Sequence, residues 1–323
     1  MVNCQVITVL EHADHIHAGF GLNDFRPLRG EPVRPEIHIR QELTPVTEEA
    51  ISAVASRPDL AVYVRSRRLV TISRDGAMLR RGIRRASNAP VIVPIEQARM
   101  LGTLDQAAAW KRFSQRDQEW CTARPPNWVA DQVLARLRWP FPYLEAVIET
   151  PTLRPDGSVL DQPGWDQETG LLFAPEDRIV WPAVPSNPTV DDVGSAVDAL
   201  LDPVRDFPFV AGSDSAAYVA VVLSIIGRHL IEGPVPGFPI RAPAPGTGKT
   251  LLAEIIGLIA TGRVPAAMSH TYQTDEFRKR VAALATDGAP IVLLENVSGS
   301  LGSDVLAGAL TASEWRDRLL GKT

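Results

Sequence analysis

Cysteine is almost absent from this chain, which has only Cys4 and Cys121 among its 323 residues. Two cysteines cannot build a disulfide framework or a four-cysteine metal site, so the small disulfide-stapled extracellular domains are excluded. Long apolar segments are lacking too, because no run approaches the roughly 18 residues that a membrane-spanning helix needs. The N-terminus also lacks a basic segment followed by an apolar one, which a secretory signal would show. We therefore expect a cytoplasmic protein without a membrane anchor.

Lysine is scarce as well: four lysines stand beside 29 arginines. A GC-rich coding sequence explains this bias, and selection for bidentate phosphate contacts is the alternative. The net charge of −5 carries no overall nucleic-acid signature, but the charge is uneven. Residues 1–150 hold 20 basic against 17 acidic residues, and the remainder holds 13 against 21. Basic charge is densest in residues 57–85, with nine arginines against Asp59 and Asp75.

The most informative stretch is residues 243–250, Pro-Ala-Pro-Gly-Thr-Gly-Lys-Thr. It follows a short extended segment, 237–240, and opens into an apolar helical segment, 251–259, which is the context of a phosphate-binding loop. Glycines let backbone N–H groups turn toward a phosphate, and a helix N-terminus adds positive potential. The alternative, a turn that only caps a helix, leaves the lysine unexplained. The expected nucleotide-binding residues are Pro245, Gly246, Thr247, Gly248, Lys249, Thr250 and Leu251.

Particular roles follow from the chemistry of such loops. Lys249 would reach the β- and γ-phosphates of ATP, and the Thr250 hydroxyl would ligate Mg²⁺. A second apolar strand, 289–294, ends in Glu295 and Asn296. We expect Glu295 to hold Mg²⁺ through water or to act as the base, and Asn296 to orient the attacking water, since an amide cannot take a proton. The expected catalytic residues are thus Lys249, Glu295 and Asn296, and the metal ligands are Thr250 and Glu295.

The Pro-x-Pro-Gly-Thr-Gly-Lys-Thr sequence resembles the phosphate-binding loop of AAA+ ATPases. A second segment, residues 151–171, contains Pro-Thr-Leu-Arg-Pro-Asp-Gly and then Pro-Gly-Trp-Asp and Thr-Gly-Leu. Together they resemble the AAA+ ATPases of phage and mobile-element helicases and primase-helicases, over roughly residues 140–320. That resemblance implies ATP hydrolysis between the subunits of a ring that moves single-stranded or forked DNA. It departs at residues 295–296, where the family's usual acidic pair is Asp-Glu and related phage helicases often read Asp-Asn.

The same resemblance implies two further strands after Glu295, of which the fourth lies between the first and third in the sheet. The chain ends 28 residues after Glu295. We therefore expect the N-terminal part of a longer ATPase, truncated after this acidic strand, with a gap or an exposed edge in its sheet and low activity of its own. A nucleotide-binding regulatory or remnant protein that does not hydrolyse ATP is the alternative, and a small-molecule kinase is a weaker one.

The expected fold is α/β: an incomplete parallel P-loop sheet of AAA+ type, preceded by a helical region and a small α+β N-terminal region. We expect residues 1–140 to form that N-terminal region with a basic hairpin. Residues 141–188 would form a β-meander with a proline-rich linker, and residues 189–323 the first part of the ATPase domain. Expected elements include a hairpin over 61–73 that turns at Ser66-Arg67, helices over 96–113 and 129–137, and a strand and helix over 266–270 and 274–285.

Two N-terminal features stay open. His12, His15 and His17 with Asp14 form either a polar loop or a metal site. The arginines between residues 65 and 85, with Tyr63 as a stacking partner, form either a nucleic-acid surface or a solvated hairpin face.

Overall fold

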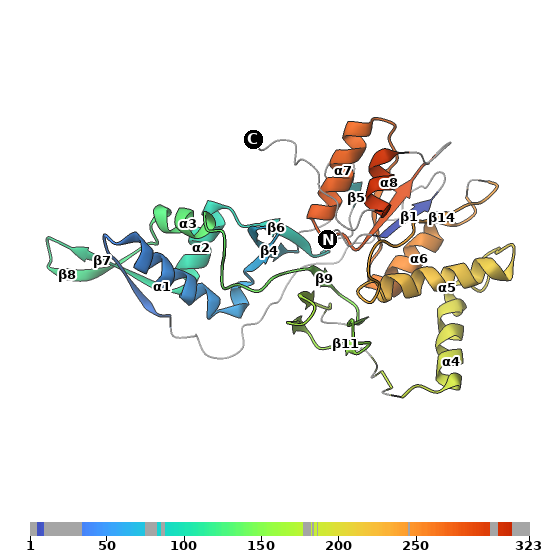
Figure 1. Cartoon of the computed structure of the whole chain (residues 1–323), viewed down its shortest axis with the longest axis horizontal. Helices are drawn as coiled ribbons and strands as arrows, with labels where there is room; N and C mark the ends of the chain where they lie inside the picture. Colours follow the sequence, from blue (N-terminus) through green and yellow to red (C-terminus); the bar gives the residue numbers. More distant parts are fainter. Residues whose placement is uncertain are drawn as a thin grey trace. The chain divides into compact units, whose positions relative to one another are not determined.

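The computed structural model describes residues 34–74, 88–176, 182, 184–185, 187–244, 246–297 and 303–311, and the backbone alone of residues 5–9 and 83–84. The chain divides into two compact units (Figure 1). Unit 1 consists of Met1–Asp14, Ser73–Val91 and Glu145–Thr323. Unit 2 consists of His15–Ile72 and Ile92–Leu144. The domain limits expected at residues 140 and 188 stay predictions.

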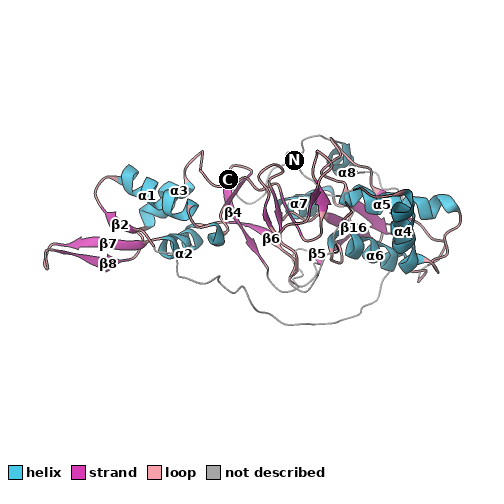
Figure 2. Ribbon diagram, turned by 90° about the horizontal axis from the view of Figure 1, so that it is seen from below, coloured by secondary structure: helices cyan, strands magenta, loops and turns pink. Residues whose placement is uncertain are grey.

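Unit 2 packs three helices against two small sheets, which Figure 2 shows in magenta beside the cyan helices. The apolar residues that meet there include Ile37, Ile51, Met100, Leu104 and Trp110, each at most 2% exposed. The helices are α1 (Leu43–Ala55), α2 (Gln97–Ala107) and α3 (Asn127–Leu134); the sheets are β2-β7-β8 (Glu36–Ile39, Ala109–Ser114, Glu119–Ala123) and β3-β4-β6 (Tyr63–Arg65, Arg68–Ser73, Val91–Pro94), with a 3₁₀ turn at Pro58–Leu60.

The expected basic hairpin is confirmed as β3 and β4. Ser66 and Arg67 both have positive φ, 48° and 59°, which is the backbone of the two-residue turn whose twist suits a hairpin. The expected helical stretch 96–113 is wrong in its second half, because α2 ends at Ala107 and β7 follows. Ala108 is extended, and the buried Trp110 donates its indole N–H to the Leu104 carbonyl at 2.9 Å.

Unit 1 is built on a five-stranded sheet in the order β14-β1-β16-β15-β5. β1, β14, β15 and β16 run parallel, and β5 is antiparallel to β15. A parallel sheet needs cover on both faces, which explains the unbroken apolar sequence of β16. The strands are β14 (Phe238–Ile240), β1 (Gln5–Val9), β16 (Ile291–Glu295), β15 (Ala266–Ser269) and β5 (Ile83–Arg84).

The two faces of this sheet carry different helices. Ile291, Leu293 and Ala267 pack with α5 (Gly212–Ile226) and α6 (Lys249–Thr261). Val292, Leu294 and Met268 pack instead with α7 (Thr274–Thr286) and α8 (Asp304–Thr311). Successive strand residues point to opposite faces, so each of β15 and β16 contributes to both layers. The expected strand 266–270 and helix 274–285 are confirmed.

The expected gap in the sheet is wrong. Ile7 of β1 pairs with Phe238 of β14 on one side and with Leu293 of β16 on the other. The N-terminal strand therefore occupies the place between the strand before the glycine-rich loop and the strand that ends in Glu295. The backbone N–H and C=O groups of β14 and β16 that face this position form hydrogen bonds with β1.

Two small sheets precede the helices of unit 1, β10-β11 (Thr152–Leu153, Val159–Leu160) and β12-β13-β9 (Gly164–Trp165, Leu171–Phe173, Ala146–Ile148). The expected simple meander is wrong in one respect, since β9 and β13 are parallel. Asp156 accepts from the Ser158 N–H at 2.8 Å and Asp166 from the Thr169 N–H at 3.0 Å, so both side chains stabilise turns. Thr189 forms a capping box at the start of α4 (Val190–Leu201).

Candidate nucleotide-binding site

The glycine-rich loop runs from the end of β14 to the first turn of α6. Gly246 and Gly248 have φ of 75° and 84°, a left-handed backbone that side chains disfavour. At Gly248 an added Cβ would lie 3.2 Å from Cε1 of Phe207, which packs over the loop. The glycine is therefore required by backbone conformation and by close approach together. Pro245 lies outside the described residues.

Lys249 lies on the inside of this loop and is only 6% exposed. Its ammonium donates to the Ala244 carbonyl at 3.0 Å and approaches Oγ1 of Thr247 at 3.4 Å. An ammonium group has three N–H donors, so one remains beyond these two contacts. A buried cation held by loop oxygens is positioned before any anion arrives, and it would lose little side-chain entropy when one binds.

The start of α6 adds backbone donors. The N-cap Gly248 has no side chain to cap the helix, and the first turn carries no acidic residue. Intrahelical bonding begins with the Leu252 N–H, which donates to the Gly248 carbonyl at 2.9 Å. The preceding N–H groups, of Lys249, Thr250 and Leu251, have no acceptor within the helix. Leu251 is 53% exposed, so its expected part in binding rests on its main chain.

Glu295 comes to the same edge of the sheet as this loop. The register Val9↔Ile240, Thr8↔Leu294 and Ser269↔Glu295 places the last residues of β14, β1, β16 and β15 in one row. Adjacent strands lie about 4.8 Å apart, so two strand spacings separate β16 from β14 by about 10 Å. By alternation Glu295 shares the face of Ile291 and Leu293, which is the face covered by α6. The sheet therefore brings Glu295 to the side of the helix that Lys249 begins.

Asn296 follows with φ of 57°. Asparagine tolerates this left-handed region better than other residues with a side chain, so the residue type suits a sharp exit from the strand. The neighbouring strand is tied to the same point, because the His270 N–H donates to the Glu295 carbonyl at 2.9 Å. Burial lowers the pKa of His270 below its ordinary value.

The alternative nucleic-acid surface around Tyr63 is not supported. Tyr63 is only 7% exposed, so its ring cannot stack on a base. Arg74 is engaged by Glu149, a carboxylate that also accepts from Arg263. The remaining arginines between residues 75 and 85, and the histidines at positions 12, 15 and 17, lie outside the residues whose side chains are described.

A groove that the sequence did not indicate lies beside the β7–β8 hairpin of unit 2. It has a volume of about 960 Å³. Arg112 and Arg124 line it and have no charge partner among the described residues, and Trp128 and Asn127 from the start of α3 close one side. The opposite face of the hairpin carries Trp120, 41% exposed, with the His38 ring stacked on it at 4.2 Å. The sequence signal for this hairpin is the alternation of apolar and polar residues over 109–114, which indicates a strand. The helix predicted over 96–113 covers the same residues.

Within the described part of the chain, no cluster of three or more His, Cys, Asp or Glu is placed to hold a metal ion. There too, no helix is long and apolar enough to cross a membrane. Comparisons with protein-family models, with curated proteins and with solved structures found no match.

Proposed function

We propose that the chain binds ATP with Mg²⁺ at the glycine-rich loop, as the nucleotide-binding module of a helicase-like AAA+ ATPase of the phage or mobile-element type that acts in DNA replication. The observation that carries this proposal is Lys249, a buried ammonium on the inside of a left-handed glycine loop at an uncapped helix start. The three N–H groups at the start of α6, which have no acceptor within the helix, and the Lys249 ammonium beside them suit a triphosphate. A turn that only capped α6 would not need the lysine.

The residues fit a nucleotide-bound Mg²⁺ better than a free metal ion. Mg²⁺ is commonly held by one or two protein groups together with substrate phosphates and water. Thr250 in the first turn of α6 and Glu295 at the end of β16 are the two protein groups proposed for it. Mg²⁺ would neutralise the developing charge on the phosphates.

Whether ATP is hydrolysed depends on the pair at the end of β16. In the proposed mechanism Lys249 binds the phosphates, Asn296 orients the attacking water, and Glu295 accepts its proton or holds the metal ion through water. Asn296 also favours the second candidate function, a regulatory protein that binds ATP without hydrolysing it, because its amide cannot accept a proton. The two candidates share the binding site and differ in turnover alone.

The binding test uses the whole chain with Mg²⁺-ATP in a calorimetric titration. Lys249→Ala should weaken ATP binding at least tenfold, because a charge-assisted contact contributes about 1.5–3 kcal/mol. Lys279→Ala is the matched control, since this lysine is exposed on α7. Equal affinity in the wild type and in Lys249→Ala would contradict the proposed site.

The proposed partner is single-stranded or forked DNA, and the intact protein would assemble into a ring. The groove beside the β7–β8 hairpin supports the DNA partner, because two unpaired arginines and an indole suit a sugar-phosphate backbone with stacked bases. Fluorescence anisotropy with a labelled 20-nucleotide thymidine strand tests this. Replacing Arg112 and Arg124 by Gln should weaken binding and flatten its salt dependence, whereas Arg136→Gln, which breaks an ion pair with Glu48, should not. ATP turnover that rises on adding the strand would select the helicase-like function.

A further inference from the structure

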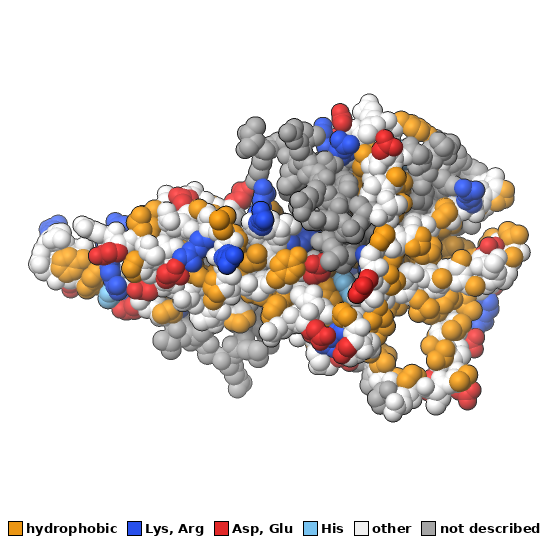
Figure 3. All heavy atoms as spheres, in the orientation of Figure 1, with side chains coloured by type: hydrophobic (Ala, Val, Ile, Leu, Met, Phe, Trp, Pro, Cys, Tyr) orange, Lys and Arg blue, Asp and Glu red, His pale blue; other side chains and the backbone are white. Residues whose placement is uncertain are grey.

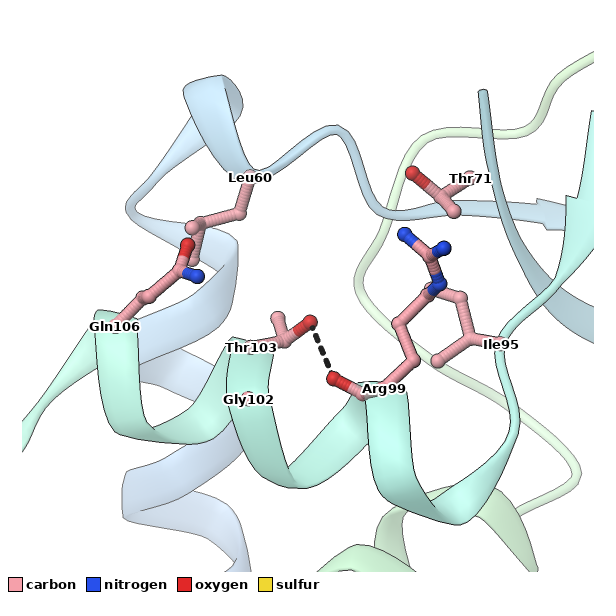
Figure 4. Close-up of a pocket in the computed structure, with 7 residues that line it drawn as sticks. All are labelled: Leu60, Thr71, Ile95, Arg99, Gly102, Thr103 and Gln106. Atoms are coloured by element: carbon pink, nitrogen blue, oxygen red, sulfur yellow. Dashed lines mark hydrogen bonds between the residues drawn. The ribbon is translucent and has the colours of Figure 1, made fainter. Parts of the chain in front are cut away.

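A cavity lies wholly within unit 2. It has a volume of about 370 Å³ and lies between α2, β4 and the 3₁₀ turn. One face of α2 lines the cavity, because four lining residues of this helix follow at spacings of three and four: Arg99, Gly102, Thr103 and Gln106. Figure 4 shows Arg99 extending from that helix toward Thr71, with Leu60 and Gln106 at the other end.

Arg99 is an exposed arginine at the open side of this cavity. Among the described residues Arg99 has no ion pair or hydrogen bond through its guanidinium. The nearest acid on the 3₁₀ turn, Asp59, is already held by Arg57 at 2.6 Å, and the pKa of Asp59 is lowered by that hydrogen bond. Arg99 also lies in the first turn of α2, at the positive end of the helix dipole, where a cation is unfavourable and an anion is favoured.

A hydroxyl group faces the same space. Thr71 is 6% exposed, lines the cavity, and makes no hydrogen bond through its side chain to any described residue. Its oxygen is open to the cavity, so a ligand there can form a hydrogen bond with it in place of water. At the other side the cavity is apolar, with Ile95, which is 5% exposed, and Leu60. Gly102 adds no side chain, and nothing lies within 4 Å of where its Cβ would be.

We propose that this cavity binds a small organic anion. Its carboxylate or phosphate group accepts hydrogen bonds from Arg99 and Thr71, and its apolar body lies against Ile95 and Leu60. The volume suits a compact ligand, because small-molecule sites span roughly 300–1,000 Å³. Guanidinium groups bind carboxylate and phosphate equally well by geometry, so the shared chemistry is an oxyanion on a short apolar frame. This site is separate from the proposed ATP site and does not depend on it.

The test is a calorimetric titration of the full chain with three probes of one shape: phenyl phosphate, benzoate and the neutral benzyl alcohol. We expect one or both anions to bind, and the neutral probe to bind at least fivefold more weakly. Whichever anion binds more tightly assigns the site to phosphates or to carboxylates. If neither anion binds at about 10 mM, which is roughly ten times a Kd of 1 mM, the proposal is overturned.

Variants then locate the binding. Arg99→Gln removes the charge, and Thr71→Val removes the hydroxyl at nearly constant volume, and each should weaken anion binding at least fivefold. Arg116→Gln is the control, because this exposed arginine in the β7–β8 turn has no partner among the described residues. An equal loss in Arg116→Gln would show unspecific charge attraction and overturn the assignment. Lys249→Ala should bind the probes with the affinity of the wild type. Loss of probe binding in this variant would place the anions at the proposed ATP site and not in the cavity of unit 2.

Discussion

The two units build their sheets in different ways. In unit 1 the central sheet contains no hairpin, and β1 pairs on both sides with strands more than 200 residues away in the sequence. In unit 2 each sheet contains a hairpin of neighbouring strands, β3–β4 and β7–β8. The glycine-rich loop and Glu295 therefore meet only if the long-range sheet forms, whereas the surfaces of unit 2 depend on shorter connections. Damage to the sheet of unit 1 should reach its candidate site and spare unit 2.

The largest effect is expected from Ile7→Pro. Ile7 pairs on both sides in the middle of the sheet, and proline there removes a backbone donor from the ladder, which central strands do not tolerate. Hydrogen–deuterium exchange should show loss of protection in β14 and β16 and unchanged protection in α1 and α2. ATP binding should fall together with the protection of β14. Ile7→Val is the control; equal protection in both variants would show that β1 is dispensable for the sheet.

A smaller effect is expected from pH. Burial, with a lesser repulsion from Arg228, lowers the pKa of His229 in unit 1 from 6.5 to about 4. Below pH 6.5 the unfolded chain binds a proton at His229, whereas the folded chain binds it only below about pH 4. Protonation therefore favours the unfolded chain between these two values, and the free energy of unfolding decreases as the pH falls from 6.5 to 4. The free energy of unfolding should drop by about 2 kcal/mol between pH 7.5 and pH 5 from this group. Urea unfolding monitored by exchange should show it in unit 1.

His229→Gln is the variant that isolates this group. Its unfolding free energy should vary less between pH 7.5 and pH 5 than that of the wild type. The same slope in both proteins would assign the acid sensitivity to other residues.

Gly248→Ala should cost about 1–2 kcal/mol, because alanine is strained at a φ of 84° and its Cβ would press on Phe207. Nucleotide affinity should decrease with it, since the loop must distort to accept the methyl group. Thermal unfolding and an ATP titration measure the two effects. Gly212→Ala is the control, at a glycine with negative φ and open space around its Cβ position; an equal loss there would contradict the conformational argument.

The smallest expected effect comes from helix caps. Thr189→Ala removes the capping box of α4 in unit 1 and should cost about 1 kcal/mol. Glu96→Ala in unit 2 should cost far less, because the Glu96 side chain makes no cap hydrogen bond to α2. Chemical denaturation measures the free energy of unfolding of both variants. Similar decreases in Thr189→Ala and Glu96→Ala would contradict the stabilising role of the capping box.

Local signals predicted much of the structure. The turn at Ser66-Arg67 and the apolar run that ends at Glu295 each lie within a few residues of the structure that they specify. The strand β7 was missed because Trp110 and its neighbours fit a helical spacing as well as a two-residue alternation. The pairing of β1 with β14 and β16 could not be predicted, since any apolar strand of about five residues would fit that place. The residues of the candidate site were predicted from the sequence. Only the structure shows that Glu295 lies on the face of the sheet that is covered by α6, the helix that begins at Lys249.

The central place of β1 also bears on synthesis of the chain. Ribosomes add roughly 5–20 residues per second, and 282 residues separate Val9 from Ile291, the first residue of β16. Strand β1 is thus synthesised before both of its neighbours and waits roughly 15–60 seconds for the second of them. Until β14 is synthesised, β1 has neither neighbour in the sheet, and unit 2 can fold in that time. Molecular chaperones that bind short apolar segments would meet β1 in this window, which makes the first strand the point at which folding of unit 1 is most exposed to error.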